Sequence, residues 1–123
     1  MNKIENLAYL FATAMNSDGK VNLKELNSWY HIVEKRWTEV PKNEAGNALK
    51  NALYCLKSQN HSERINYLEK VLENLKLNLK KSDLDNLAKD LSSMIKADGI
   101  IALGEMNLAG LLKYKLGIDI NLD

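Results

Sequence analysis

Four carboxylates occupy matching places in two short segments of the chain. Asp18 and Glu25 belong to the first segment, and Asp98 and Glu105 belong to the second. In both segments a Gly follows the Asp, and the Glu comes seven residues after the Asp. Carboxylate oxygens suit Ca²⁺ or Mg²⁺, whereas zinc prefers His and Cys, which neither segment contains. The four carboxylates are therefore candidate ligands of a divalent cation, provided that the two segments meet in space.

The same four residues have a purely structural alternative. Asp18 and Asp98 each stand at the predicted end of a helix, where a negative charge near free carbonyl groups costs about 0.3–1 kcal/mol. Each Asp can offset this by accepting hydrogen bonds from free N–H groups of the turn, and Glu25 and Glu105 can bond to the N-termini of their own helices. On this interpretation the carboxylates only cap helices, and no metal is bound.

The first segment also overlays in part on the calcium-binding loop of an EF-hand. Asp18 and Glu25 fall at the fifth and twelfth places of that loop. Its first place requires a carboxylate, but Ala14 stands there in the first segment and Met94 in the second. The sequence therefore does not predict a working EF-hand.

The rest of the chain has the pattern of helices that position these two segments. Hydrophobic residues recur at helical spacing, and Val, Ile and Thr are sparse beside Leu, Ala, Lys, Glu and Asn, which argues against strands. The expected helices span about residues 2–16, 22–38, 41–56, 62–79, 82–95 and 102–116. We therefore predict an all-α fold, a single compact domain over residues 1–123. Two helix-Asp-Gly-helix segments, the first acidic corner (14–26) and the second acidic corner (94–106), flank a central hairpin.

Local signals mark the expected helix ends and faces. Ser62 and Ser82 are predicted N-caps of the fourth and fifth helices, and Gly117 is predicted to end the sixth. Ile65 is expected to face the core. The second helix is expected to bury one stripe of residues, namely Leu23, Leu26, Tyr30, Val33 and Trp37.

Composition limits the partners and the compartment. The chain has 17 basic and 16 acidic side chains, so its formal charge of +1 creates no overall field that would attract nucleic acid or anionic lipid. No apolar run is long enough to cross a bilayer, and the single Cys55 cannot form an internal disulfide. We expect a cytoplasmic protein with no transmembrane segment and no nucleic-acid partner.

Other residues bear on catalysis and on protein partners. Neither His31 nor His61 has an obvious Ser, Cys or carboxylate partner from which a catalytic triad could be built, so we predict no enzyme. Acid and base catalysis by the paired carboxylates is the alternative. Core packing is the default for Trp29 and Trp37. If the Trp29 ring lies outside the buried stripe, it would be a partner-binding anchor. We expect a protein partner, with a homodimer as an alternative.

The acidic corners also resemble those of a known family. The runs Asp18-Gly19-Lys20-Val21 with Glu25, and Ala97-Asp98-Gly99 with Glu105, are similar to the paired "ADG-x-V-x-x-x-E" corners of the TerB-like family. The run Leu116-Gly117-Ile118 resembles the "LGI" that tends to end the last helix of that family. The chain departs from the family pattern at Ser17 and at Gly104.

This resemblance implies a fold and a function. The TerB-like family includes the tellurite-resistance protein TerB and the N-terminal domain of the co-chaperone DjlA. Membership implies a compact all-α module of a bacterial stress response of the tellurite-resistance type, non-enzymatic, cytoplasmic and acting through protein partners. It also allows a metal site at Asp18, Glu25, Asp98 and Glu105. The alternative is a protein–protein interaction or regulatory domain without metal, in which these residues serve as helix caps.

Overall fold

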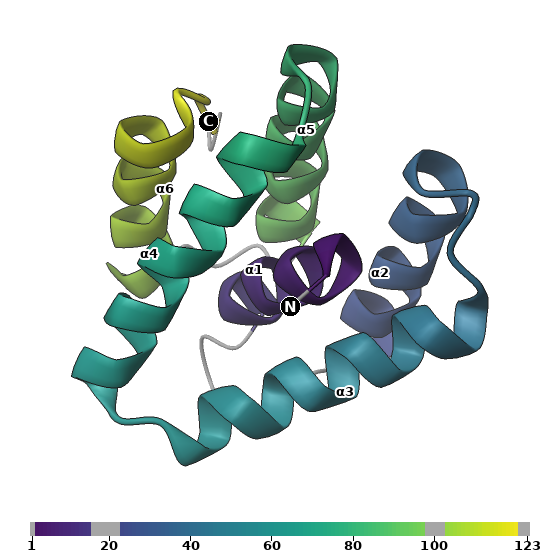
Figure 1. Ribbon diagram of the computed structural model, residues 1–123, viewed down its shortest axis with the longest axis horizontal. Helices are drawn as coiled ribbons and strands as arrows, with labels where there is room; N and C mark the ends of the chain where they lie inside the picture. Colours follow the sequence, from purple (N-terminus) through teal and green to yellow (C-terminus); the bar gives the residue numbers. More distant parts are fainter. Residues whose placement is uncertain (1, 16–22, 98–102, 121–123) are drawn as a thin grey trace.

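The computed structural model describes residues 2–15, 23–97 and 103–120, and for 24–25, 95–97 and 103–109 it describes the backbone alone. Six helices follow one another in these ranges: α1 (Lys3–Met15), α2 (Leu23–Arg36), α3 (Lys42–Ser58), α4 (His61–Asn78), α5 (Lys81–Ala97) and α6 (Leu103–Leu116) (Figure 1). No strand occurs in the described ranges. The all-α prediction is therefore confirmed, and the helices fall where the hydrophobic periodicity places them.

Helix α1 is the centre of the fold. Helices α2, α3, α4 and α5 surround it, and its most extensive contacts are with α3 and α4 (Figure 1). Ten of its 13 residues are buried, among them Leu7, Leu10 and Phe11. A helix that is apolar on all sides requires cover on all sides. At 13 residues α1 is too short to cross a bilayer, and none of the other described helices is long and apolar enough to do so.

Helices α3 and α4 diverge from their junction and pack on α1 instead of on each other, so the predicted central hairpin is wrong (Figure 1). The junction itself also differs from the predicted one. Asn60 rather than Ser62 is the N-cap of α4, because Asn60 Oδ1 accepts a hydrogen bond from the Glu63 N–H at 2.9 Å. Glu63 Oε1 accepts one from the Asn60 N–H at 2.9 Å in return. This reciprocal capping box satisfies two backbone donors that the first turn of α4 leaves free.

The end of α3 is satisfied by a side chain from α4. Arg64 donates from Nε and Nη2 to the Leu56 carbonyl oxygen, at 2.9 and 2.6 Å. A cation at this position also interacts favourably with the C-terminal end of the α3 dipole. The neighbouring Ile65 is 40% exposed. The prediction that Ile65 faces the core is therefore wrong, since this turn of α4 directs Arg64 towards α3.

The two remaining predicted ends give one correction and one confirmation. Helix α5 begins at Lys81, because Asp83 Oδ2 accepts a hydrogen bond from the Lys80 N–H at 3.2 Å, so the predicted Ser82 cap is wrong. Helix α6 ends as predicted: Gly117 has a φ of 70°, and its N–H donates to the Lys113 carbonyl oxygen at 3.0 Å. A side chain at that φ would be strained, which explains the Gly.

Helix α2 buries part of the predicted stripe together with residues beside it. Among the residues whose side chains are described, those buried in α2 and in the turn that follows it are Trp29, Ile32, Val33 and Trp37. The prediction is therefore confirmed for Val33 and Trp37, whereas Tyr30 is only half-buried and Leu23 is 75% exposed. The buried face extends from the predicted stripe towards Trp29 and Ile32. This brings the large Trp29 ring against Phe11 of α1, with 5.3 Å between the ring centroids.

Candidate functional site

The four predicted metal ligands lie at the edges of the described chain. Asp18 and Asp98 fall outside the described residues. Glu25 and Glu105 are each the third residue of a helix, α2 and α6, and only their backbone is described. Helices α1 and α5 end within the two acidic corners, at Met15 and Ala97, and α2 and α6 begin within them, as the repeat predicts. The metal site itself therefore stays a prediction.

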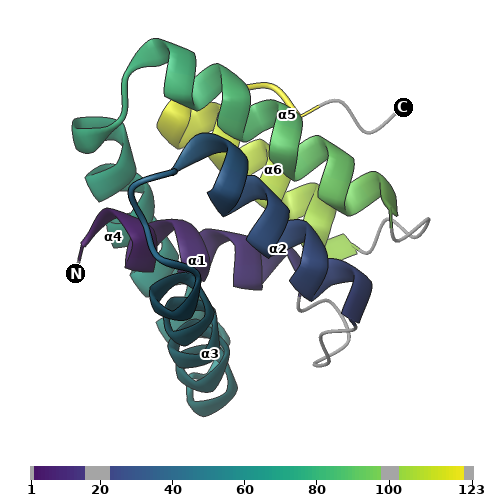
Figure 2. The ribbon, with the colours of Figure 1, turned by 90° about the vertical axis from the view of Figure 1, so that its right-hand side faces the viewer.

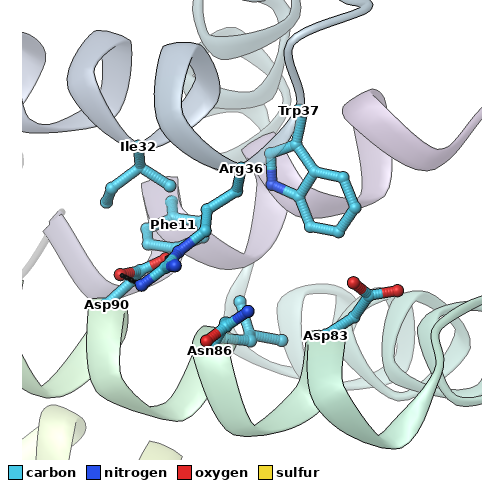
Figure 3. Close-up of a pocket in the computed structure, with 8 residues that line it drawn as sticks. Phe11, Ile32, Arg36, Trp37, Asp83, Asn86 and Asp90 are labelled. Carbon is cyan, nitrogen blue, oxygen red and sulfur yellow. Dashed lines mark hydrogen bonds and ion pairs between the residues drawn. The ribbon is translucent and has the colours of Figure 1, made fainter.

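The packing of α2 against α5 decides how the described ends of the two acidic corners lie, namely the start of α2 and the end of α5. Arg36, at the end of α2, contacts Asp90 in the middle of α5. In Figure 3, Ile32 of α2 lies at the Asp90 end of this contact, and Trp37, which follows α2, lies at the Asp83 end. Residue numbers therefore rise in opposite directions along the two helices, which makes α2 and α5 antiparallel. Figure 2 shows this arrangement with the two helices side by side.

The antiparallel packing places the flanks of both corners on one side of the molecule. Leu23 precedes Arg36 by about 20 Å along α2, and Ala97 follows Asp90 by about 10 Å along α5, at 1.5 Å per residue. The start of α2 and the end of α5 thus lie within about 10 Å of each other along their shared direction. In Figure 2 the end of α1 and the start of α6 point towards the same side.

Arg36 of α2 and Asp90 of α5 form a bidentate ion pair (Figure 3). Arg36 Nε lies 3.2 Å from Asp90 Oδ2, and Arg36 Nη2 lies 3.3 Å from Asp90 Oδ1. The two side chains are only 21% and 14% exposed. A planar guanidinium facing a carboxylate in this way fixes orientation as well as distance.

A small cavity adjoins this ion pair. It has a volume of about 30 Å³ and lies between α2 and α5, with Phe11 of α1 on its inner side (Figure 3). Ile32 and Leu87 contribute apolar wall, while Asp83 and Asn86 contribute polar wall. One or two water molecules would fill such a volume, which is too small for a substrate.

A second cavity lies between α1, α3 and α4. Its volume is about 70 Å³, and Tyr9, Cys55 and Tyr67 are among its lining residues. The Tyr9 hydroxyl donates to Gln59 Oε1 at 2.8 Å, and the Tyr9 and Tyr67 rings lie 4.5 Å apart. Burial raises the pKa of the Cys55 thiol and of the Tyr9 phenol. Cys55 is therefore a neutral thiol at pH 7 and a poor nucleophile.

The partner-binding assignment of Trp29 is wrong, and the default of core packing is confirmed for both tryptophans. Trp29 is wholly buried, and Trp37 is 7% exposed. The Trp29 indole N–H donates to the Ala45 carbonyl oxygen of α3 at 3.0 Å. A ring enclosed in this way presents no surface to a partner. Its apolar area and its polar atom are both used inside the domain.

Other combinations of ionisable groups do not assemble within the part of the chain that is described. His31 and His61 are both exposed. Where side chains are described, no three His, Cys, Asp or Glu residues lie close enough to share a metal ion. The four predicted ligands are outside that set, so this finding leaves the acidic corners untested.

Comparison with family models, with curated proteins and with solved structures gives no match to this chain. The geometry defines the class of the protein as an all-α domain whose described helices surround a buried first helix. The TerB-like resemblance remains a prediction based on the two acidic corners.

Proposed function

We propose that this chain is a non-enzymatic helical module of the TerB-like type that binds Ca²⁺ or Mg²⁺ between its two acidic corners. The ligands would be Asp18, Glu25, Asp98 and Glu105, and the bound form would act on a protein partner in a bacterial stress response. The observation that supports the proposal is the antiparallel packing of α2 on α5. It puts the helix ends that flank the two corners on one side of the molecule.

Electrostatic repulsion between the carboxylates is the reason why this arrangement would favour a bound cation. Four carboxylates gathered on one side of a small domain repel one another, and a divalent cation between them would remove that repulsion. A cation that binds only the folded form stabilises it by about 2.7 kcal/mol at a concentration 100 times its dissociation constant. For a domain of this size, such a gain corresponds to a rise in Tm on the order of 10 °C.

Thermal unfolding with and without the cation tests the proposal. The protein is freed of metal with a chelator, and Tm is measured as CaCl₂ or MgCl₂ is added up to the millimolar range. We expect Tm to rise in the native chain, and the rise to vanish in the double variant Asp18→Asn with Asp98→Asn. Glu44→Gln is the matched control, since Glu44 is an exposed carboxylate in the first turn of α3. An unchanged Tm of the native chain across the titration would reject the cation site.

A partner-binding module without metal is the second candidate. Leu23 supports it, because this large apolar side chain is 75% exposed at the first turn of α2, within the first acidic corner. On this alternative the carboxylates only cap helices, so Asp18→Asn would lower Tm by the same amount with and without the cation. The titration above therefore separates the two candidates.

A further inference from the structure

We propose that the Arg36–Asp90 ion pair sets the register of α2 against α5, and through it the separation between the start of α2 and the end of α5, instead of serving mainly as a source of stability. The use of that separation for a cation rests on the proposed function. The register itself does not, and it can be measured without any cation.

The burial of the pair argues against a large net stabilisation. Both side chains are mostly withdrawn from water, at 21% and 14% exposure. The loss of hydration offsets much of the attraction between two such charges, and apolar residues of similar volume often stabilise a protein equally well or better. Contacts between apolar side chains are not directional, however. A bidentate guanidinium–carboxylate contact forms both of its hydrogen bonds in only one relative position of the two helices.

Apolar packing near the pair leaves this position underdetermined. The cavity of about 30 Å³ beside the pair shows that Phe11, Ile32 and Leu87 do not fill the space between the helices. Large and small side chains that interlock completely would define a register without help. Here the polar contact supplies what the apolar contact lacks.

The same face of α5 offers other polar groups if α2 slides. Asn86 and Asp83 line the same pocket as Asp90 and lie about 6 and 10 Å from it along the helix, at 1.5 Å per residue. Asn86 carries no charge, and Asp83 accepts the hydrogen bond from the Lys80 N–H at the start of α5. Asp90 is thus the carboxylate of this row that is available to pair with Arg36 through both oxygens.

The position of the pair has its effect at the other end of α2. Among the residues of α2 whose side chains are described, those that are fully buried lie from Trp29 onwards, Leu26 is partly buried, and Leu23 in the first turn is 75% exposed. The position of the first turn therefore depends mainly on the contacts of the later turns. A shift of one helical turn between α2 and α5 would change the distance between the start of α2 and the end of α5 by about 5 Å.

Distance measurement between spin labels tests the proposal. Labels are placed at Leu23 and Ser93, both exposed, in a Cys55→Ser background, and the protein is kept free of divalent cations. We expect a single narrow distribution of distances for the parent. In the apolar pair Arg36→Met with Asp90→Leu, we expect a Tm equal to or above that of the parent, and a distribution that is shifted or broadened by about 5 Å, one helical turn.

Two further variants keep the test decisive. Asp90→Asn retains the shape of the side chain and removes its charge, so it should also broaden the distribution, and it serves if the apolar pair does not fold. Lys113→Gln with Asp119→Asn removes an ion pair whose side chains are 73% and 80% exposed, and it should leave the distribution unchanged. A parental distribution in the apolar pair or in Asp90→Asn would overturn the proposal, as would equal broadening in the control. If the native chain bound no cation, the proposed function would be rejected, but the conclusion that the Arg36–Asp90 pair sets the helix register would not be affected.

Discussion

The Trp29 indole N–H and the Ala45 carbonyl oxygen are joined by a hydrogen bond of 3.0 Å inside the domain. Trp29 is wholly buried, and its ring also contacts Phe11, so one side chain connects α2 to both α3 and α1. The ring and the hydrogen bond together attach α2 to α1 and α3, whereas the Arg36–Asp90 pair joins it to α5.

Trp29→Phe should therefore lower the free energy of unfolding by about 2 kcal/mol, through lost apolar contact and a lost buried hydrogen bond. Urea unfolding followed by circular dichroism measures this change. Tyr54→Phe is the control, because Tyr54 is 77% exposed and its change should stay within about 0.5 kcal/mol. A Trp29→Phe variant as stable as the native protein would contradict the assigned role.

Gly46 should be coupled to Tyr30. A Cβ atom at Gly46 would lie 2.6 Å from the Tyr30 hydroxyl oxygen, which is closer than real contacts allow, whereas the ring carbons would lie at 3.5 Å. Ala is favoured over Gly within a helix by about 1 kcal/mol. Gly46→Ala should gain most of this in a Tyr30→Phe background and clearly less in the native chain. Equal effects in the two backgrounds, measured by urea unfolding as a double-mutant cycle, would refute the contact.

The buried side chain of Asn6 should lower the stability of the core. Its side chain is 1% exposed, and its Oδ1 has no hydrogen-bond partner within the described part of the chain. Its Nδ2 donates to the Asn2 carbonyl oxygen, which also accepts from the Asn6 backbone N–H and therefore stays satisfied without the side chain. Asn6→Leu should stabilise the protein by about 1–2 kcal/mol in urea unfolding. Asn51→Leu, at an exposed position of α3, is the matched control. A destabilised Asn6→Leu variant would show that the amide is needed.

Alkaline pH should destabilise the protein through the second cavity. Burial raises the pKa of Cys55 and of Tyr9, whereas the unfolded chain releases these protons near the ordinary values of 9.0 and 10.0. Above those values the unfolded state binds fewer protons than the folded state, so the free energy of unfolding decreases as pH rises. Stability is therefore complete below about pH 9 and falls above it.

The double variant Cys55→Ala with Tyr9→Phe should lose a part of this alkaline slope. Urea unfolding at about pH 8 and about pH 10.5 measures it, and the native chain and the variant are compared as differences between the two pH values. Tyr54→Phe removes an exposed phenol and should keep the native slope. If the double variant kept the native slope as well, the buried groups of this cavity would not be its origin.

The helices could be predicted from the sequence because each one buries a face, and burial of a face imposes a period on the residues. Helix ends were harder to predict. Asn60 and Ser62 are both good caps, and the choice between them depends on Glu63, which stands three residues after Asn60 and completes the capping box. That spacing was present in the sequence. The half box of Lys80 and Asp83 gave a weaker signal, because Lys has no side-chain acceptor.

The face of α2 and the contact between α2 and α5 could not be predicted locally. Trp29 and Tyr30 are adjacent and both large, and Trp29 faces inward because Phe11 and the Ala45 carbonyl lie there to receive it. Arg36 and Asp90 are 54 residues apart, and neither helix alone indicates that they meet. The predicted metal ligands depend on the same long-range packing.

The buried position of α1 has a consequence for synthesis on the ribosome. This helix is made before the other five described helices, yet the helices that cover it extend to Ala97. At about 5–20 residues per second, roughly 4–16 s pass between the emergence of its last residue and the completion of α5. During that interval the hydrophobic side chains of α1 are not yet covered by all of the helices that later bury them. A chaperone that holds α1 would therefore act on a segment that later forms the interior of the molecule.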